Sequence, residues 1–505
     1  MLGGRIGTHA RPTGWWFRAW PWAFGALTLN FVVLLLRQLP CEVGGQTNYL
    51  ALCYSDVRVL WYWRGLQDGQ VPYFQFPQVE YPVLTGAFME LGRRLVVLLG
   101  GQSQPGLTGD AIAYADHLFF GVTAVLIFLL FAVLVWAHLR MHRPWDALMI
   151  ALSPAILTTG LINWDALVVT LTSVALLAWS RRKHAWAGVW LGLAVAAKLY
   201  PLLLLGPLFV LALRTGKWRE FFATLGGAVG AWLVVNLPVM IWAPEGWLYF
   251  WTFNVGRGAD LGSIWYALDL AGITIPALST VETLLLLFGA LGIGALLLFA
   301  PRRPRLAQGA FLIVALFLVV NKVYSPQYVL WLLPLLVLAR PKWLDWAIFS
   351  VAETLYFVAI WAHLDGVLST SDASGKFYWL AVFLRVGVQL WLMSRVITDI
   401  FDPSGDPVRA DGSDDPDGGV FDQAPDAAWL QRLRTRRTGQ LTVTGTLTTS
   451  APTSQDGFGV ATPESSPVTE TDSQQDQPGG LSVLRGSFSA TDDPDSTAAT
   501  DVRYS

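Results

Sequence analysis

Long apolar stretches recur from residue 20 to about residue 400, and they constrain the fold more than any other feature of the sequence. Many have roughly the 20 residues that a helix needs to cross the hydrocarbon core of a bilayer. A segment inside lipid must satisfy its backbone hydrogen bonds internally, which favours helices over open sheets. Since 54% of the residues are hydrophobic and only 14% are charged, the sequence predicts an all-α polytopic membrane protein.

Length and flanking charge predict a bundle of about twelve membrane-spanning helices within residues 20–400. The predicted spans are 20–37, 117–139, 146–162, 165–180, 185–198, 200–214, 220–242, 277–300, 306–321, 324–339, 344–362 and 377–397. Residues 185–214 are divided into two short spans because Pro201 lacks an amide hydrogen and crowds the preceding turn of a helix.

The stretch 82–99 is also apolar, but Glu90, Arg93 and Arg94 lie in its middle. We therefore assign it to an amphipathic helix at the membrane surface rather than to a span. It belongs to the first of two long loops, 38–116 and 243–276. Loops of this length usually carry function or small structures of their own.

Basic residues in the short loops between spans set the predicted orientation. All of these loops fall on one side of the membrane, which the positive-inside rule identifies as the cytoplasm. They are Arg140–Arg143, Arg181–Lys183, Arg214–Arg219, Arg302–Arg305 and Arg340–Lys342. We therefore expect a plasma-membrane protein with a cytoplasmic N-terminal segment, 1–19, and a cytoplasmic C-terminus.

Residues 401–505 have a different composition, rich in Asp, Gly, Pro, Ser and Thr and poor in aromatic residues. Such a segment buries too little apolar area to offset its ordering entropy. We predict that it is a disordered, acidic cytoplasmic tail.

Four polar clusters interrupt the apolar chain, and all four fall at the outer side in this topology. They are Asp56 with Arg58, Asn163–Asp165, Lys198–Pro201 and Asn321–Tyr324. Charged groups within hydrocarbon cost several kcal/mol each, so polar groups that converge on one face of a bundle usually mark a functional site.

Two carboxylates of the first outer loop are candidates for chemistry. Asp56 could act as a general base whose pKa is tuned by burial and by Arg58; the alternative is a loop cap or a salt bridge to Arg58. Glu80 and Tyr81 lie between prolines that stiffen the chain, and they could bind an acceptor. A rigid elbow before the surface helix is the alternative for this segment.

Lys198 and Lys322 are the best candidates for binding a phosphate at the membrane surface, with Tyr200 and Tyr324 as nearby hydroxyl donors. The alternative for each lysine is snorkelling of the side chain towards water. Arg257 in the second outer loop could also bind a phosphate, or it could belong to an interfacial aromatic belt.

The remaining candidates are weaker. Asn163 and Asp165 could bind substrate, or Asp165 could cap the following helix. His363, near an outer span end, titrates in a useful range. Cys41 and Cys53 in the first outer loop could form a disulfide in an oxidising exterior, or they could be unpaired thiols.

Several kinds of site are missing from the sequence. It has no Walker A loop, no dinucleotide-binding glycine motif, no Cys/His cluster with zinc spacing and no nucleophile elbow. Its basic residues flank spans and form no basic soluble face, so nucleic acid is not an expected partner. We predict no cofactor and assign no residue to a metal, while the need for a divalent metal stays open; any transferred group must arrive already activated.

Five of these segments together resemble glycosyltransferase family 87, a group of polyprenol-phosphate-mannose-dependent mannosyltransferases in the wider GT-C class. The segments are Tyr54–Asp56, Val79–Gly86, Asn163–Asp165, Ala197–Pro201 and Asn321–Tyr328. The likeness covers roughly residues 20–400, and the last string is its most specific part.

The resemblance implies a GT-C-like transmembrane domain that binds a lipid-linked sugar donor at its outer face, with an acidic residue of the first outer loop as catalytic base. Asp56 is the matching position. From charge and side we assign the donor phosphate to Lys198, Lys322, Arg257, Tyr200 and Tyr324. We assign the sugar or the acceptor to Arg58, Glu80, Tyr81, Asn163, Asp165, Gln327 and His363. A metal is not always needed in this class.

The resulting hypothesis is inverting transfer of a sugar, mannose above all, from a polyprenyl-phosphate donor to an envelope glycolipid or glycan. A transporter or flippase of a lipid-linked sugar is the alternative, and the broken pair of spans at 185–214 favours it. A non-catalytic scaffold is the third possibility.

Overall fold

The computed structural model describes residues 14–43, 48–368 and 375–442. Within these ranges 73% of the residues are helical and there are no strands, which confirms the all-α prediction. Most of the predicted N-terminal segment, residues 1–13, and most of the predicted tail, residues 443–505, lie outside the described residues.

Within the part of the chain that the structure describes, six helices are long and apolar enough to cross a membrane. They are α2 (Ala19–Val43), α5 (Asp110–Leu139), α11 (Trp218–Trp242), α14 (Leu278–Phe299), α17 (Trp343–Leu364) and α18 (Gly375–Phe401). These apolar helices indicate a membrane protein.

The predicted count of about twelve spans is not confirmed, because the other predicted spans are short apolar helices. They are α8 (Asp165–Ser180), α9 (His184–Ala197), η3 (Tyr200–Leu204) with α10 (Leu205–Thr215), α15 (Leu306–Val320), and η4 (Pro326–Tyr328) with α16 (Val329–Ala339). The span expected at 146–162 is broken into α6 (Ala147–Ala151) and α7 (Pro154–Thr159). Pro154 stands at this break, where its ring prevents the helix from continuing.

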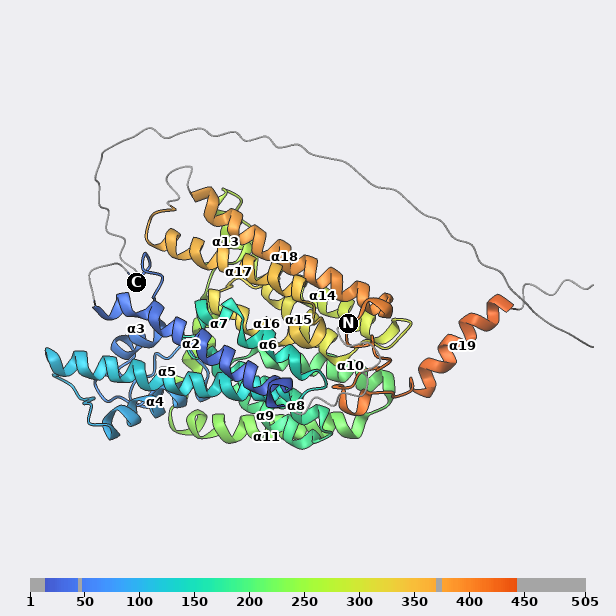
Figure 1. Ribbon diagram of the computed structural model, residues 1–505, viewed down its shortest axis with the longest axis horizontal. Coiled ribbons are helices and arrows are strands. Elements are labelled where there is room, and N and C mark those ends of the chain that lie inside the picture. Colours follow the sequence, from blue (N-terminus) through green and yellow to red (C-terminus); the bar gives the residue numbers. More distant parts are fainter. Residues whose placement is uncertain (1–13, 44–47, 369–374, 443–505) are drawn as a thin grey trace, which may run out of the picture. The chain divides into compact units, whose positions relative to one another are not determined.

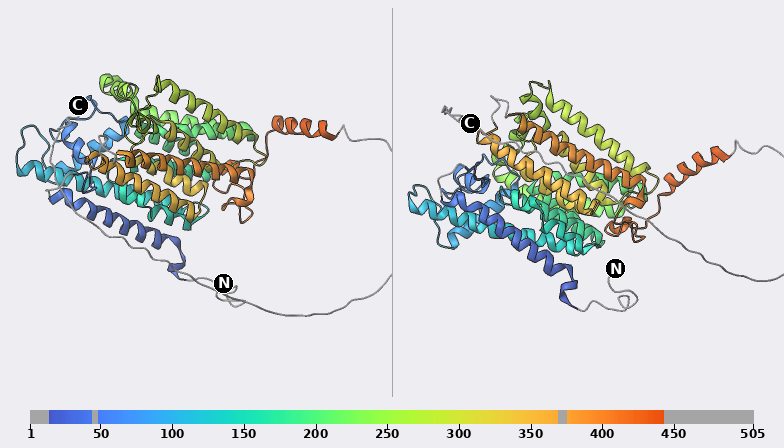
Figure 2. Two further views of the ribbon diagram at one scale, coloured as in Figure 1. Left: turned by 90° about the horizontal axis from the view of Figure 1, so that it is seen from above. Right: turned by 45° about the horizontal axis from the view of Figure 1, so that its top comes forward.

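The short helices pack in the interior, and several long ones lie outside them. α8 contacts α5 and α9, α9 contacts α11, and α15 contacts α14, α16 and α18. Figure 1 and the turned views of Figure 2 show these neighbours running side by side. Nearly every residue of α16 is buried, whereas α14 buries only Leu297 fully. A helix enclosed by protein can be short and interrupted, because its neighbours shield its backbone from lipid.

A G-x-x-x-G pair explains the close contact between α9 and α11. A Cβ atom on Gly188 would lie 2.0 Å from the Thr224 carbonyl oxygen, and one on Gly192 would lie 2.1 Å from that of Ala228. Small residues one turn apart let two helix backbones approach, which drives helix association in membranes.

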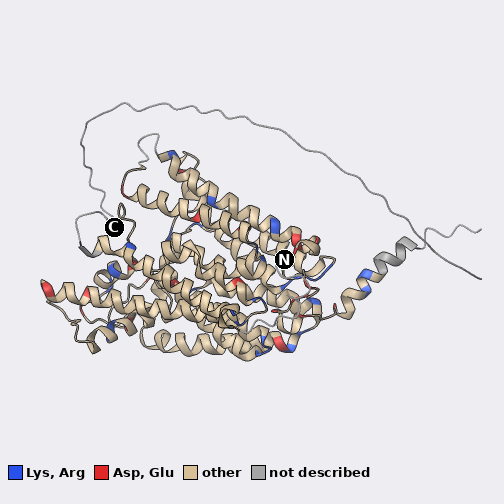
Figure 3. Ribbon diagram, viewed as in Figure 1, with Lys and Arg blue, Asp and Glu red and all other residues tan. Residues whose placement is uncertain are grey.

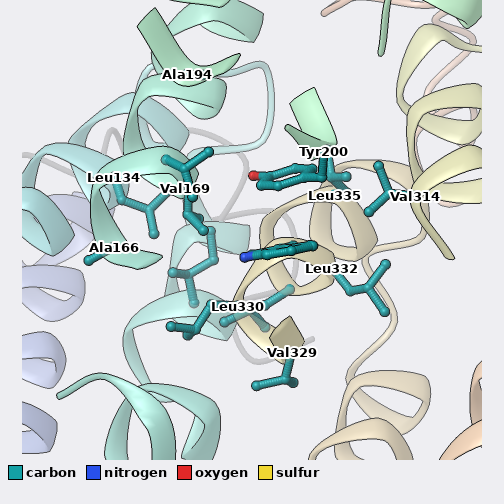
Figure 4. Packing of buried hydrophobic residues seen from close by; sticks show 14 of the residues in the cluster. Leu134, Ala166, Val169, Ala194, Tyr200, Val314, Val329, Leu330, Leu332 and Leu335 are labelled. Carbon is teal, nitrogen blue, oxygen red and sulfur yellow. The ribbon is translucent and has the colours of Figure 1, made fainter. Parts of the chain in front are cut away.

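The core lies where η3 meets α5, α8, α9, α15 and α16. Figure 4 shows Leu134, Ala166, Val169, Ala194 and Val314 gathered around Tyr200 and the α16 leucines. The Tyr200 ring stacks on Trp331 with ring centroids 4.5 Å apart. This packing supports the segment that carries Lys198.

The loop segments contain helices of their own. The first long loop holds α3 (Asp56–Trp63) and α4 (Val83–Leu98), in which Glu90 pairs with both Arg93 and Arg94. The second holds α12 (Pro244–Gly256) and α13 (Ile264–Leu270).

The segment after α18 differs from the sequence prediction, because residues 402–435 are packed against one end of the bundle. Its aspartates meet the arginines of the basic loops: Asp406 pairs with Arg305 at 2.7 Å, and Asp414 pairs with Arg303. Other backbone and side-chain contacts reach His142, Trp179 and Arg214. The basic loops therefore share one end of the bundle, and charged residues are sparse along the long helices (Figure 3). The last helix, α19 (Ala428–Thr442), begins within this segment.

We expect Asp406→Asn to destabilise the bundle, because Asp406 and Arg305 are both almost fully buried and the Arg305 guanidinium would lose its counter-charge. Removing one partner of a buried ion pair costs about 3–5 kcal/mol. Thermal unfolding in detergent measures the effect. Asp402→Asn, at an exposed position of the same segment, is the matched control, and equal midpoints for the two variants would contradict this account.

Candidate functional site

A cavity of about 510 Å³ opens between the two long-loop segments and the ends of the short helices. It lies at the far end of α15 from the packed C-terminal segment, since Arg305 precedes this helix and Asn321 and Lys322 follow it. The predicted site residues that line it come from segments far apart in sequence. They are Asp56, Glu80, Tyr81, Asn163, Lys198, Tyr200, Arg257, Lys322 and Gln327.

Asp56 begins α3, and the backbone holds it firmly. Ser55 caps the helix by accepting from the Val57 amide at 3.3 Å, and its hydroxyl donates to the Leu161 carbonyl at 2.5 Å. The Asp56 amide donates to the Ile162 carbonyl at 2.7 Å. The Tyr81 hydroxyl lies 3.4 Å from Asp56 Oδ2. Asp56 is half-buried and lines the cavity.

The surroundings of Asp56 tune its acidity. Burial raises the pKa of this carboxyl to about 6, the nearby charges of Glu80 and Asp165 add to the rise, and the Tyr54 hydroxyl and Lys198 oppose it. A carboxyl with a pKa near neutrality can both accept and release a proton at physiological pH.

Arg58 does not line the cavity. It pairs with Asp116 of α5 at 2.6 Å, and its guanidinium lies over the Phe120 ring. Residues two apart on a helix point in different directions, so the α3 helix that presents Asp56 to the cavity turns Arg58 away from it.

Lys198 sits at the break between α9 and η3, with extended backbone angles. Its Nζ atom lies 2.8 Å from Asp165 Oδ1 and within 5.1–5.5 Å of the ring centroids of Tyr81, Tyr328 and Trp331. The Lys198 ammonium is therefore surrounded by aromatic rings and paired with a carboxylate inside the protein.

The turn before α8 supplies that partner. Asp165 is almost fully buried, and its backbone amide donates to Asn163 Oδ1 at 3.0 Å. Asn163, which lines the cavity, thus stabilises the start of the helix, and Asp165 is free to face Lys198 instead of acting as the helix cap.

Lys322 and Arg257 occupy a more open part of the cavity wall. The Lys322 amide donates to Glu282 Oε1 at 3.3 Å, and its Nζ atom lies 3.4 Å from the Val255 carbonyl oxygen. Arg257 pairs with Asp260, and both side chains are about one-third exposed. The Asp260 amide donates to the Lys322 carbonyl at 2.9 Å, so these two segments are joined.

Besides Arg58 and Asp165, two further predicted residues do not line the cavity. Tyr324 is fully buried and donates its hydroxyl to Gln389 Oε1 of α18 at 2.7 Å. His363 stacks on Tyr378 and contacts the Leu368 carbonyl through Nδ1. Tyr200 lines the cavity, but its hydroxyl bonds to Thr172.

The structure adds cavity residues that the sequence analysis did not single out. Glu282 is one, and it is an ionisable residue near the start of the apolar helix α14, a placement that by itself suggests function. Asn254 is another, one helical turn before Arg257. Tyr54, Tyr328 and Trp331 complete the aromatic part of the wall.

Cys41 and Cys53 are joined in a disulfide, with Cα atoms 6.0 Å apart, just before Asp56. Among the described residues, no three His, Cys, Asp or Glu side chains gather in a way that could hold a metal ion.

Residues 112–321 match the family model of glycosyltransferase family 87. The chain contains a glycosyltransferase family 87 domain. No curated protein matches the chain. The matched region includes Asn163, Lys198, Arg257 and Glu282, whereas Asp56 lies outside it.

We expect Lys198→Met to destabilise the protein, because it leaves the buried Asp165 carboxylate without its partner. The loss should be about 3–5 kcal/mol, and adding Asp165→Asn should recover much of it. Thermal unfolding of both variants measures this. If the single variant is as stable as the wild type, the ion pair is not a structural element of the site.

Proposed function

We propose that this protein is a glycosyltransferase that transfers a sugar, with mannose as the first candidate, from a polyprenyl-phosphate donor. The acceptor is a hydroxyl of an envelope glycolipid or glycan at the outer membrane face, and the transfer inverts the anomeric carbon. The observation that carries the proposal is the shared cavity of Asp56, Lys322 and Arg257. Its volume of about 510 Å³ falls within the range of about 300–1,000 Å³ typical of small-molecule sites.

In the proposed reaction Asp56 accepts the proton of the acceptor hydroxyl as the oxygen attacks the anomeric carbon. A new carbon–oxygen bond forms on one face, and the bond to the phosphate oxygen breaks on the other. The electron pair leaves with the polyprenyl phosphate, and nearby cations stabilise its growing negative charge. No metal is assigned a role.

Lys322 and Arg257 are better candidates than Lys198 for binding the phosphate, because less free energy is lost when they leave their present partners. Drawing Lys198 away would leave Asp165 buried and unpaired, at a cost of about 3–5 kcal/mol. The Arg257–Asp260 pair is partly exposed to solvent, and such pairs contribute only about 0–1 kcal/mol. The donor phosphate is therefore best placed at the Lys322 and Arg257 end of the cavity, with Lys198 supporting Asp56 and Asp165.

The bilayer contributes to the reaction as well. A donor whose polyprenyl chain stays in the lipid presents its sugar at the membrane surface, beside the cavity. Confining the donor in this way replaces part of the entropy loss of a bimolecular encounter.

Asp56→Asn should lower the rate of sugar transfer by about 10²–10⁴-fold, the usual contribution of a general base. Burial already disfavours the ionised carboxylate, so the amide should leave the fold intact. Transfer of labelled mannose from polyprenyl-phosphate mannose in reconstituted membranes measures the rate. Asp110→Asn, at an exposed position on the same side, is the control, and undiminished transfer in the Asp56 variant would remove this residue from the mechanism.

The pH dependence should follow the same carboxyl. A general base works only when deprotonated, so kcat/KM should fall as the pH drops through about 6, the pKa of Asp56, and decline about tenfold per pH unit below it. A pH–rate profile at saturating donor and at acceptor concentrations well below KM measures this. An acid limb centred near pH 4 would assign the base to a carboxyl that burial does not perturb.

A further inference from the structure

A buried ion pair lies inside the helical bundle behind the cavity, and the proposed reaction does not use it. Arg385 of α18 donates through Nε to both carboxylate oxygens of Glu353 on α17, at 2.9 and 3.0 Å. The two side chains are 0% and 6% exposed. Charges within a membrane bundle are costly and usually serve a function.

The other nitrogens of Arg385 reach the backbone of the segment after α15. Nη1 donates to the Tyr324 carbonyl at 2.8 Å, and Nη2 lies 3.4 Å from the Ser325 carbonyl oxygen. The guanidinium also lies between two rings, 3.4 Å from the centroid of Tyr324 and 4.1 Å from that of Tyr356. The planar fork of arginine suits such simultaneous contacts, which a lysine cannot reproduce.

The segment after α12, residues 257–262, is hydrogen-bonded to the segment after α15, residues 321–325. The Asp260 amide donates to the Lys322 carbonyl at 2.9 Å, and the Tyr324 amide donates to the Leu261 carbonyl at 3.4 Å. Gly262 has a φ of +80°, and a Cβ atom there would lie 2.1 Å from the Tyr324 carbonyl oxygen. The two segments therefore meet at a close backbone approach that only glycine allows.

We propose that Arg385, held by Glu353, is a positioning residue that sets the placement of Lys322 and Arg257 in the cavity wall. It acts through the Tyr324 and Ser325 carbonyls and the joined segments 257–262 and 321–325. The assignment of a donor phosphate to these cations rests on the proposed function, whereas the mechanical role of Arg385 does not.

Stability alone gives little reason for this pair. Replacing both partners of a buried ion pair with neutral residues is often close to neutral for folding. What neutral residues cannot supply is a fixed donor for two adjacent carbonyls in an irregular segment. Orientation errors of about 1 Å at a binding group can cost about 10²-fold in rate.

The test compares two double variants that each remove one buried Arg–carboxylate pair. Arg385→Met with Glu353→Gln removes the pair behind the cavity. Arg305→Met with Asp406→Asn removes the matched pair at the opposite end of α15, where Arg305 also donates to two carbonyls, those of Leu338 and Ala339. Arg385→Lys is a third variant that keeps the charge beside Glu353 but cannot span both carbonyls.

We expect the Arg385 double variant to raise the KM for polyprenyl-phosphate mannose about tenfold or more, while the acceptor KM stays within about twofold. Amide hydrogen exchange in residues 258–263 and 321–325 should become about tenfold faster or more. The Arg305 double variant should change neither quantity. Arg385→Lys should shift the donor KM and the exchange rate in the same direction as the double variant by a smaller factor. If the double variant does not fold, Arg385→Lys serves as the test of the positioning role.

Unchanged exchange and unchanged donor KM in a folded Arg385 variant would overturn the proposal, as would equal changes in the Arg305 control. If wild-type protein transfers no sugar from a polyprenyl phosphate, the proposed function fails. The exchange measurement still decides the positioning role in that case.

Discussion

The ion pair between Lys198 and Asp165 is the interaction on which the site depends. It joins the break between α9 and η3 to the start of α8, and the rings of Tyr81, Tyr328 and Trp331 enclose it. Two charges removed from water in this way are stable only together. The pair therefore holds these two chain segments together at one point, and Asp56 and Asn163 line the cavity beside it.

Both ends of the bundle carry charged side chains, but those at one end are more deeply buried than those at the other. At the end occupied by residues 402–435, aspartates meet the arginines of the basic loops, and Arg305 and Asp406 are almost fully enclosed. At the cavity end, Lys322 and Arg257 remain partly accessible. A closed set of ion pairs serves the fold, whereas cations with accessible surface can meet an anionic ligand.

Much of the site could be predicted from the sequence, because charge is rare in this chain and its position relative to the spans is readable. Asp56, Lys198 and Lys322 were expected on one side of the bundle, and they line one cavity. The break after Lys198 followed from Pro201. The direction of individual side chains was harder to predict, since it depends on where a helix starts and on its neighbours. Arg58 and Tyr324 turn away from the cavity for that reason.

Composition misled the prediction in two other places. Considered alone, the aspartates between residues 402 and 426 indicate disorder. In the structure they supply counter-charges for arginines more than 100 residues earlier in the chain, and the Arg305–Asp406 pair is an example. Span length was the second difficulty. Helices such as α16 can be short because other protein, rather than lipid, surrounds them. Neither long-range relationship is visible in a local window of sequence.

The Lys198–Asp165 pair also bears on the acidity of Asp56. A free lysine beside a carboxyl would lower its pKa strongly, and the carboxyl would then be a poor base. Here Asp165 already shares the charge of Lys198, and the nearby charges of Asp165 and Glu80 act on Asp56 in the opposite sense. Burial therefore prevails, and the pKa of Asp56 stays at about 6. The arrangement that makes Lys198 a costly phosphate ligand is thus the one that leaves Asp56 basic enough to accept a proton.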